Sequence, residues 1–398
     1  MVSEFRKIAN QQFSPERYQA FLALIEQGCP GQLEFRISET PVFMSKELKH
    51  RLVAAGDYIV DFIAQPGFKA LTEAAIPANC QVPNESDHPE FLAIDYAICA
   101  DSEGNLTPRL IELQGFPSLF CFQEWFSRLI EDNLYVPPNY SYLFGNLQSA
   151  DYIALLNRTI LGSFQPHQVV LLEIEPKRQK TRIDFFCTEM LTGVKAVCVT
   201  EVYERDNMLF HLDSEGQEQR IHRIYNRVIF DELLARTDLN LRFDFAKSYL
   251  VEWAGHPAWF FRVSKYLLPF LDHPSVPVTR PITQLKPAAE DLKNYVLKPL
   301  FSFAGQGVVF DVQQKDIDAV PDPENWILQE KVFYAPAIKA PDADVKCEIR
   351  LLYLWPKGDS RPTLCTNLIR LSQGSMMGVR FNKDKTWVGG NTAFLERD

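Results

Sequence analysis

The sequence predicts a mixed α/β (α+β) fold, with helices at the N-terminus, a small parallel α/β unit in the middle, and strands and hairpins around it. Three observations lead to this prediction. The first 75 residues show helical periodicity, apolar runs alternate with a helical segment over residues 169–202, and long apolar runs separated by turn sequences make up most of the rest. Pro137-Pro138 and Gly145 mark a boundary, and we expect three parts: residues 1–160, 161–240 and 241–398.

The composition is that of an ordinary globular protein. Of 398 residues, 46% are hydrophobic and 23% are charged. The net charge of -10 argues against a general nucleic-acid binder. No apolar run reaches the roughly 18 residues of a transmembrane helix, and residues 1–12 are too polar for a signal peptide. The eight cysteines are scattered without a C-x-x-C pair, so we expect buried, reduced thiols in a cytoplasmic protein. From the charge and the lack of a long apolar run, we expect a protein that binds neither nucleic acid nor membrane.

The N-terminal part is predicted to be a helical scaffold. Ser14 is placed to cap a helix over Pro15–Gln27, with proline at the first helical position. Ser45–Ala64 shows a second long amphipathic pattern, and Cys121–Asp132 is helix-like. Between these helices, Ala75–Asp87 is rich in proline and asparagine and is predicted to be a loop.

A predicted hairpin follows this loop. Phe91–Cys99 is an apolar run, residues 101–105 have turn chemistry, and Arg109–Gln114 forms the second strand. A turn centred on Glu103-Gly104 sets Asp95 directly across from Glu112. Because residues at i and i+2 share a face of a strand, the side chain of Gln114 joins them.

These three oxygen-bearing side chains form a candidate metal site. Directly opposed carboxylates repel each other, and a Mg²⁺ ion, which prefers oxygen ligands, would relieve the repulsion between Asp95 and Glu112. The alternative is an exposed polar face in a different register. Both strands are too apolar for solvated edge strands, which favours the buried site.

The middle of the chain is predicted to be a small parallel α/β unit. Val169–Ile174 and Val197–Val202 are strand-like, and Ile183–Leu191 between them is helix-like. A hairpin signal follows, and its second strand, Gln219–Tyr225, leads to Arg227. An arginine at a strand end of an α/β unit suits a substrate carboxylate, although an ordinary surface arginine is the alternative.

The stretch Tyr295–Phe310 is a candidate phosphate-binding segment. An apolar run brings Lys298 to a strand end, Pro299 stops the ladder, and a loop with Gly305 and Gly307 leads into a second apolar run. Glycines let backbone N–H groups close on an anion, and the lysine adds a point charge. A plain hairpin is the alternative, because the lysine precedes the glycines, unlike a Walker P-loop.

Three further strands are predicted in the C-terminal part. Trp326–Val332 contains the polar triplet Gln329-Glu330-Lys331, which favours either an adenine-binding hinge or an amphipathic edge strand. Cys347–Trp355 places Glu348 and Arg350 on one face. Leu364–Leu371 carries Arg370 and ends at a loop of small residues.

Taken in order from about Phe91 to about Asn391, these motifs resemble the circularly permuted ATP-grasp ligases, above all eukaryotic-type glutathione synthetase and more distantly glutathionylspermidine synthetase. The resemblance implies an ATP-grasp-like, circularly permuted fold with an inserted substrate domain. It implies metal ligands at Asp95, Glu112 and Gln114; nucleotide-binding residues at Lys265, Lys298, Gly305, Gln306, Gly307, Gln329, Glu330 and Lys331; and catalytic or substrate-orienting arginines at Arg227 and Arg370.

The activity that the resemblance implies is ATP-dependent carboxylate–amine ligation through an acyl phosphate. ATP and Mg²⁺ are the expected cofactors, a small amino-acid- or peptide-like molecule the expected substrate, and a homodimer the expected assembly. Three positions depart from the family pattern: Gln114 stands for asparagine, Ser302 for a third metal carboxylate, and Ala93 for a substrate-binding arginine. The last two favour an alternative, an ATP-binding protein with a decayed site and a binding or regulatory role. A soluble α/β protein without a nucleotide site is the third hypothesis.

Overall fold

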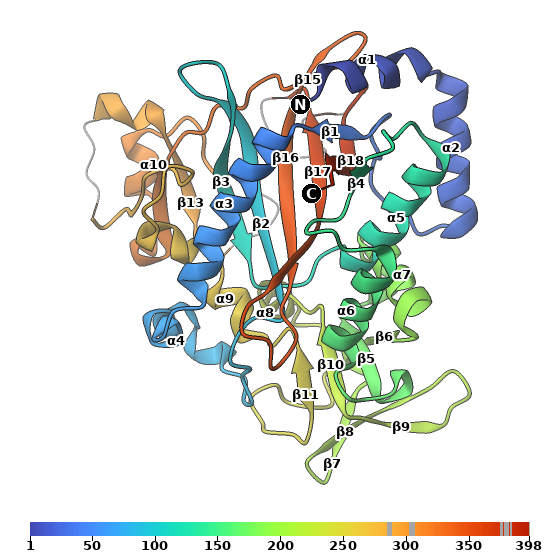
Figure 1. Cartoon of the computed structure of the whole chain (residues 1–398). Helices are drawn as coiled ribbons and strands as arrows, with labels where there is room; N and C mark the ends of the chain where they lie inside the picture. The colour runs from blue at the N-terminus through green and yellow to red at the C-terminus, as the bar shows by residue number, and fades with distance from the viewer. Residues whose placement is uncertain (285–288, 302–306, 375–376, 378–381, 383, 398) are drawn as a thin grey trace.

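The architecture is a long antiparallel sheet with helices on its faces and two smaller units at its periphery (Figure 1). It is seen in a computed structural model that describes residues 1–284, 289–301, 307–374, 377, 382 and 384–397. The mixed α/β class predicted from the sequence is therefore confirmed.

The central sheet has the strand order β18-β17-β16-β2-β3, and all its neighbours are antiparallel. β15 pairs with β16 outside this path. The strands run over Phe91–Ala100 (β2), Leu106–Gln114 (β3), Ile338–Lys339 (β15), Asp344–Leu354 (β16), Thr363–Ser372 (β17) and Gly389–Asn391 (β18).

The β2–β3 hairpin brings Asp95 opposite Glu112, as predicted. The strands do not pair in one uniform register, however, as the prediction assumed. Pairing begins with Ala100 opposite Leu106, and an irregularity between Asp95 and Tyr96 then shifts it by one residue. A β-bulge of this kind re-aims the side chains that follow it, and here it turns Glu112 toward Asp95.

The N-terminal helices and a small sheet cover the upper end of the central sheet in Figure 1. Ser14 caps α2 by accepting a hydrogen bond from the Arg17 amide at 3.2 Å, as predicted. β1 pairs in parallel with β19, which brings the two chain ends together. These elements are α1 (Ser3–Gln12), α2 (Pro15–Gly28), β1 (Val42–Met44), β4 (Tyr140–Ser141) and β19 (Ala393–Glu396).

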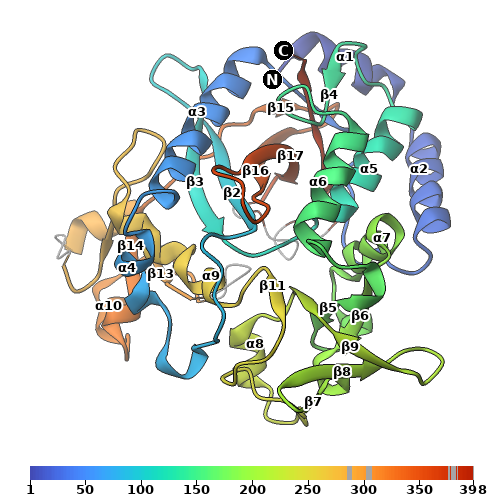
Figure 2. The ribbon, with the colours of Figure 1, turned by 60° about the horizontal axis from the view of Figure 1, so that its bottom comes forward.

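The small parallel α/β unit is also confirmed, in the order β11-β10-β5-β6. Figures 1 and 2 show it beyond one end of the central sheet. Its strands and the helices near it are α5 (Phe120–Asn133), α6 (Ser149–Leu161), β5 (Val169–Glu173), α7 (Arg182–Thr192), β6 (Lys195–Cys198), β10 (Arg223–Asn226), α8 (Phe230–Ala235) and β11 (Glu252–Ala254).

One predicted strand in this unit is split. The expected run Gln219–Tyr225 divides at His222, where the backbone bonds to Gln168 and to Glu252. Its polar first half becomes β9 (Glu218–Ile221), which pairs with β8 (Met208–Leu212). Its buried second half becomes β10 and enters the parallel sheet. β7 (Tyr203–Arg205) completes the outer hairpin sheet.

A third unit carries the candidate phosphate segment. β14 (Trp326–Glu330) lies between β12 (Thr279–Pro281) and β13 (Tyr295–Pro299) in the sheet, and α10 (Gln314–Asp318) stands between β13 and β14 in the chain. The prediction of a strand over Val308–Val312, after the glycine loop, is wrong. Among the described residues this segment makes a single β-bridge, between Leu297 and Val309. Phe310 is turned outward, so the apolar run does not continue the pleat. Two short helices, α4 (Phe68–Leu71) and α9 (Ala258–Arg262), connect the units.

The structure bears on two further predictions, the state of the cysteines and the lack of a membrane-spanning helix. All eight cysteines are free thiols, and seven of them are buried. Within the described residues, no helix combines the length and the apolar character needed to cross a membrane.

The long helix α3 (Lys46–Ile63) packs against the central sheet at a glycine. A Cβ atom on Gly56 would lie 2.0 Å from the hydroxyl oxygen of buried Tyr353. We therefore expect Gly56→Ala to destabilise the protein by about 1–3 kcal/mol in urea unfolding, although alanine is the better helix former. Adding Tyr353→Phe removes the clashing oxygen and should recover part of the loss. An unchanged or raised stability in Gly56→Ala would contradict this packing.

Candidate functional site

The candidate site lies on the face of the central sheet opposite α3. Leu92 and Ile94 point into the core shared with α3, whereas Phe91 and Ala93 point into the core shared with α5. Asp95 follows on this second face. The apolar packing ends there, and buried or half-buried charged residues from three neighbouring strands continue the same face.

Asp95 is held by two arginines. Arg350, its direct cross-strand neighbour on β16, donates from Nε to Oδ1 at 2.6 Å and from Nη2 to Oδ2 at 2.7 Å. Arg370 on β17 donates from Nη2 to Oδ2 at 2.6 Å. Burial alone would raise the pKa of Asp95, but the charges of Arg350 and Arg370 outweigh it and lower this pKa. Asp95 is therefore a buried carboxylate that stays ionised.

A second carboxylate on the same face of the sheet, Glu348, also pairs with an arginine. Glu348 on β16 lies directly opposite Arg370, forms an ion pair with it, and accepts a hydrogen bond from the Tyr334 hydroxyl at 2.7 Å. Burial lowers the pKa of Arg370. The negative charges of Glu348 and Asp95 raise this pKa by more than burial lowers it, so the net shift is upward. The side chain of Arg370 is still 38% exposed, although its Nε is buried without a hydrogen-bond partner in the described part of the chain.

Two lysines face these strands from another unit. Lys265 begins a 3-10 turn, and its ammonium lies 3.2 Å from Glu112 Oε1. Lys298 on β13 is buried and donates to Gln329 Oε1 at 2.6 Å. Burial, followed by the charge of Lys265, lowers the pKa of Lys298 to about 8, although Glu112 and Glu348 oppose the shift. The predicted phosphate lysines are thus brought together beside the predicted metal carboxylates.

We call this set the site cluster: Asp95, Glu112, Lys265, Lys298, Glu348, Arg350 and Arg370. Its four cations outnumber its three carboxylates by one, but a further carboxylate, Asp231, lies close enough to Lys265 for the two charges to interact. A buried cation whose pKa is depressed is stabilised when an anion binds beside it. The arrangement therefore suits an anionic ligand.

The predicted metal ligands do not fit a resident Mg²⁺ ion. Both oxygens of Asp95 are bound by arginines, and Glu112 faces Lys265. Gln114 lies across from Ala93 rather than from a second acidic residue. Among the residues that the structure describes, no three histidine, cysteine, aspartate or glutamate side chains gather as a metal site. The repulsion that suggested a metal is relieved by protein cations.

The glycine loop is only partly described. Gly305, Gln306 and Ser302 lie outside the described residues. Gly307 has φ of 73°, and a Cβ atom there would lie 3.1 Å from the ring of Pro299. The left-handed conformation explains why glycine suits the position where the chain leaves the loop.

The predicted adenine hinge is a central strand, not an edge strand. The backbone amide of Glu330 donates to Val278 and that of Lys331 to Asn294, at 2.9 and 2.8 Å. The side chain of Gln329 bridges Lys298 and Thr279. These groups are already used within the protein, so Gln329 orients Lys298. Adenine contacts by Glu330 and Lys331 stay predictions.

Arg227 lies outside the site cluster, in the small parallel unit. It is buried, forms an ion pair with Asp184 on α7, and stands 4.8 Å from the ring centroid of Phe185. Asp184 also accepts a hydrogen bond from the Phe122 amide at 2.8 Å. These contacts join α5, α7 and the end of β10, and the substrate role of Arg227 stays a prediction.

Sequence reasoning missed the contributions of Arg350, Glu348 and Tyr334. A signal existed for the first two, because they are charged residues at alternate positions of an otherwise apolar strand. Tyr334 gave no signal, since it belongs to an irregular segment after β14.

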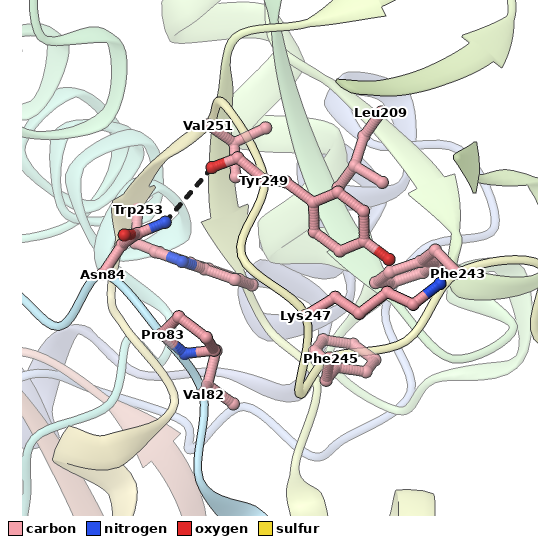
Figure 3. A pocket seen from close by; sticks show the side chains of 10 residues that line it. All are labelled: Val82, Pro83, Asn84, Leu209, Phe243, Phe245, Lys247, Tyr249, Val251 and Trp253. Atoms are coloured by element: carbon pink, nitrogen blue, oxygen red, sulfur yellow. Dashed lines mark hydrogen bonds between the residues drawn. The ribbon is translucent and has the colours of Figure 1, made fainter. Parts of the chain in front are cut away.

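A separate shallow hollow lies in the small unit (Figure 3). Aromatic side chains of residues 243–253 face Val82–Asn84 across it, and Asn84 donates to the Tyr249 carbonyl at 3.1 Å. Its rim carries Lys247, which forms an ion pair with Glu204. None of the site-cluster residues lines this hollow.

The lowered pKa of Lys298 predicts pH-dependent anion binding. The protonated ammonium binds a phosphate group, so affinity for tripolyphosphate should be highest below pH 8. It should then fall by up to about tenfold per pH unit above that value. Calorimetric titration from pH 7 to 9 measures this change. In Lys298→Met the dependence should disappear, and a flat profile in the unmodified protein would contradict the assignment.

The Asp184–Arg227 ion pair predicts a structural role. Asp184→Ala leaves a buried arginine without its partner, so we expect a loss of about 3–5 kcal/mol in chemical denaturation. Replacing both residues, as in Asp184→Ala with Arg227→Met, should restore much of that loss. A loss below about 1 kcal/mol in the single variant would argue against a structural pair.

Comparison with known proteins places the fold. No protein family matches the sequence, and no curated protein does. Among solved structures, the chain is similar to a glutathione synthetase-like effector (GSS30) from Globodera pallida in its apo form. The TM-score is 0.57 and the identity 12%, over 97% of this chain and 98% of that one. At this identity the likeness concerns the fold alone: the chain has a mixed α/β fold that is distantly related to a glutathione synthetase-like structure.

Proposed function

We propose that this protein is an ATP-dependent carboxylate–amine ligase that acts on a small amino-acid- or peptide-like substrate. The observation that supports the proposal most is the pair of lysines. Lys298 is buried beside Lys265 with a pKa lowered to about 8, in a cluster with one more cation than carboxylates. A polyphosphate would relieve this electrostatic cost.

The residues suit phosphoryl transfer to a carboxylate. In the proposed reaction, a substrate carboxylate oxygen bonds to the γ-phosphorus while the bond to ADP breaks. Lys265 and Lys298 neutralise the charge on the transferring group. The accessible part of Arg370 orients the substrate carboxylate. An amine nitrogen then attacks the acyl carbon, phosphate leaves, and the amine gives up a proton.

The fold supports the same class of chemistry. The similar solved structure is described as a glutathione synthetase-like effector, and the motif order along this chain resembles ATP-grasp ligases. No nucleophilic side chain is needed for the two steps. The departure at Ala93 leaves the substrate contacts different from the family pattern, so the acid and the amine must be found by screening.

The test combines binding with turnover. Thermal unfolding is measured with and without ATP, and ADP release is screened with amino acids and dipeptides as acids and amines. We expect Lys298→Ala to lose the ATP-induced shift and to lower kcat/KM about 10²–10³-fold, with the fold retained. Lys357→Ala is the matched control, because this lysine is 79% exposed and pairs only with Glu252 among the ion pairs of the described residues.

Two outcomes would contradict the ligase. If Lys298→Ala keeps the activity of the unmodified protein, then the lysine pair is not the phosphate site. If ATP shifts the unfolding temperature but no acid and amine release ADP, then nucleotide binding stands and ligation fails.

A further inference from the structure

The opposed carboxylates of the β2–β3 hairpin have their repulsion relieved by the protein itself. Asp95 and Glu112 face each other directly on neighbouring strands, a pairing that is unfavourable without a counter-charge. On the other side of Asp95, the direct cross-strand neighbour is Arg350. Lys265 stands 3.2 Å from Glu112. Each carboxylate of the pair therefore has its own cation from another part of the chain.

The contact between Arg350 and Asp95 is closed and buried. Arg350 uses Nε and Nη2 on both oxygens of Asp95, at 2.6 and 2.7 Å, and its Nη1 donates to Ser118 Oγ at 3.3 Å. Asp95 is 1% exposed and Arg350 is 8% exposed. A planar guanidinium matches a carboxylate in this two-bond geometry and stays charged at any physiological pH.

We propose that Arg350 takes the place of a metal ion on Asp95, so that polyphosphate binding by Lys265 and Lys298 does not require a divalent cation. This inference deepens the proposed function and rests on its nucleotide site. A cation would have to displace a buried, two-bonded guanidinium and a second arginine, Arg370, before it reached the Asp95 oxygens. The phosphates would supply negative charge beside the buried ammonium of Lys298.

The first test uses the nucleotide-free protein. Mn²⁺ is titrated and followed by electron paramagnetic resonance, which reports the ion directly and needs no activity. The unmodified protein should show no site that depends on Asp95, whereas Arg350→Leu should gain one. Asp95→Leu with Arg350→Leu should lose it again. A Mn²⁺ site in the unmodified protein that disappears in Asp95→Asn would overturn the proposal.

The second test compares ATP affinity in EDTA and in Mg²⁺. For the unmodified protein the two dissociation constants should agree within about threefold, and in Arg350→Leu chelation should weaken binding by about tenfold or more. Arg223→Leu is the matched control, since Arg223 is a buried arginine paired with Glu252 in the small parallel unit. Its ratio should equal that of the unmodified protein. A loss of more than tenfold on chelation in the unmodified protein would overturn the proposal.

The outcomes separate this inference from the proposed function. If Arg350→Leu does not fold, the double leucine variant decides: its ratio between EDTA and Mg²⁺ should stay near one, and strong dependence on Mg²⁺ would refute a metal-replacing arginine. If the unmodified protein binds no ATP in either condition, the proposed function fails. The Mn²⁺ titration still decides the state of Asp95 in that case.

Discussion

The buried ion pair between Asp95 and Arg350 is the interaction on which the site depends. It joins β2 to β16 at the middle of the central sheet, and it leaves Arg370 positioned between Asp95 and Glu348. Removing one partner would leave a charge buried without compensation, which costs several kcal/mol in known cases. The geometry of the cluster is therefore tied to the integrity of the sheet.

The position of the cluster follows from how the sheet is packed. One face packs into an apolar core that it shares with α3, and the other packs against α5 where Phe91, Ala93 and Leu352 point toward it. Beyond these residues the same face carries charge, and the unit that holds Lys298 approaches it. A fold built this way places the site cluster where two units meet, and ligand sites commonly occur at such places.

Much of the fold was predictable because local signals carry it. The cap at Ser14, the β2–β3 turn and the alternation of the small parallel unit all depend on neighbouring residues. Lys265 and Lys298 were predicted from motif order to act together, and the structure places them close to each other, whereas their contacts with phosphate stay predictions. The Asp95–Glu112 pairing was found, although a bulge rather than a uniform register produces it.

What could not be predicted depends on contacts between distant parts of the chain. Arg350 reaches Asp95 across 255 positions of sequence, and only the strand order of the finished sheet makes them neighbours. Arg227 turns into its own unit because Asp184, on a helix, offers a buried partner. The side chain of Gln329 forms hydrogen bonds with Lys298 and Thr279, which lie on the two strands that flank β14.

A crystal structure with a non-hydrolysable ATP analogue tests the central claim most directly. We expect phosphate oxygens within hydrogen-bond distance of Lys265 and Lys298, with Asp95 still bound by Arg350 and Arg370. A nucleotide bound elsewhere, or Asp95 turned away from the arginines onto a metal ion, would contradict it.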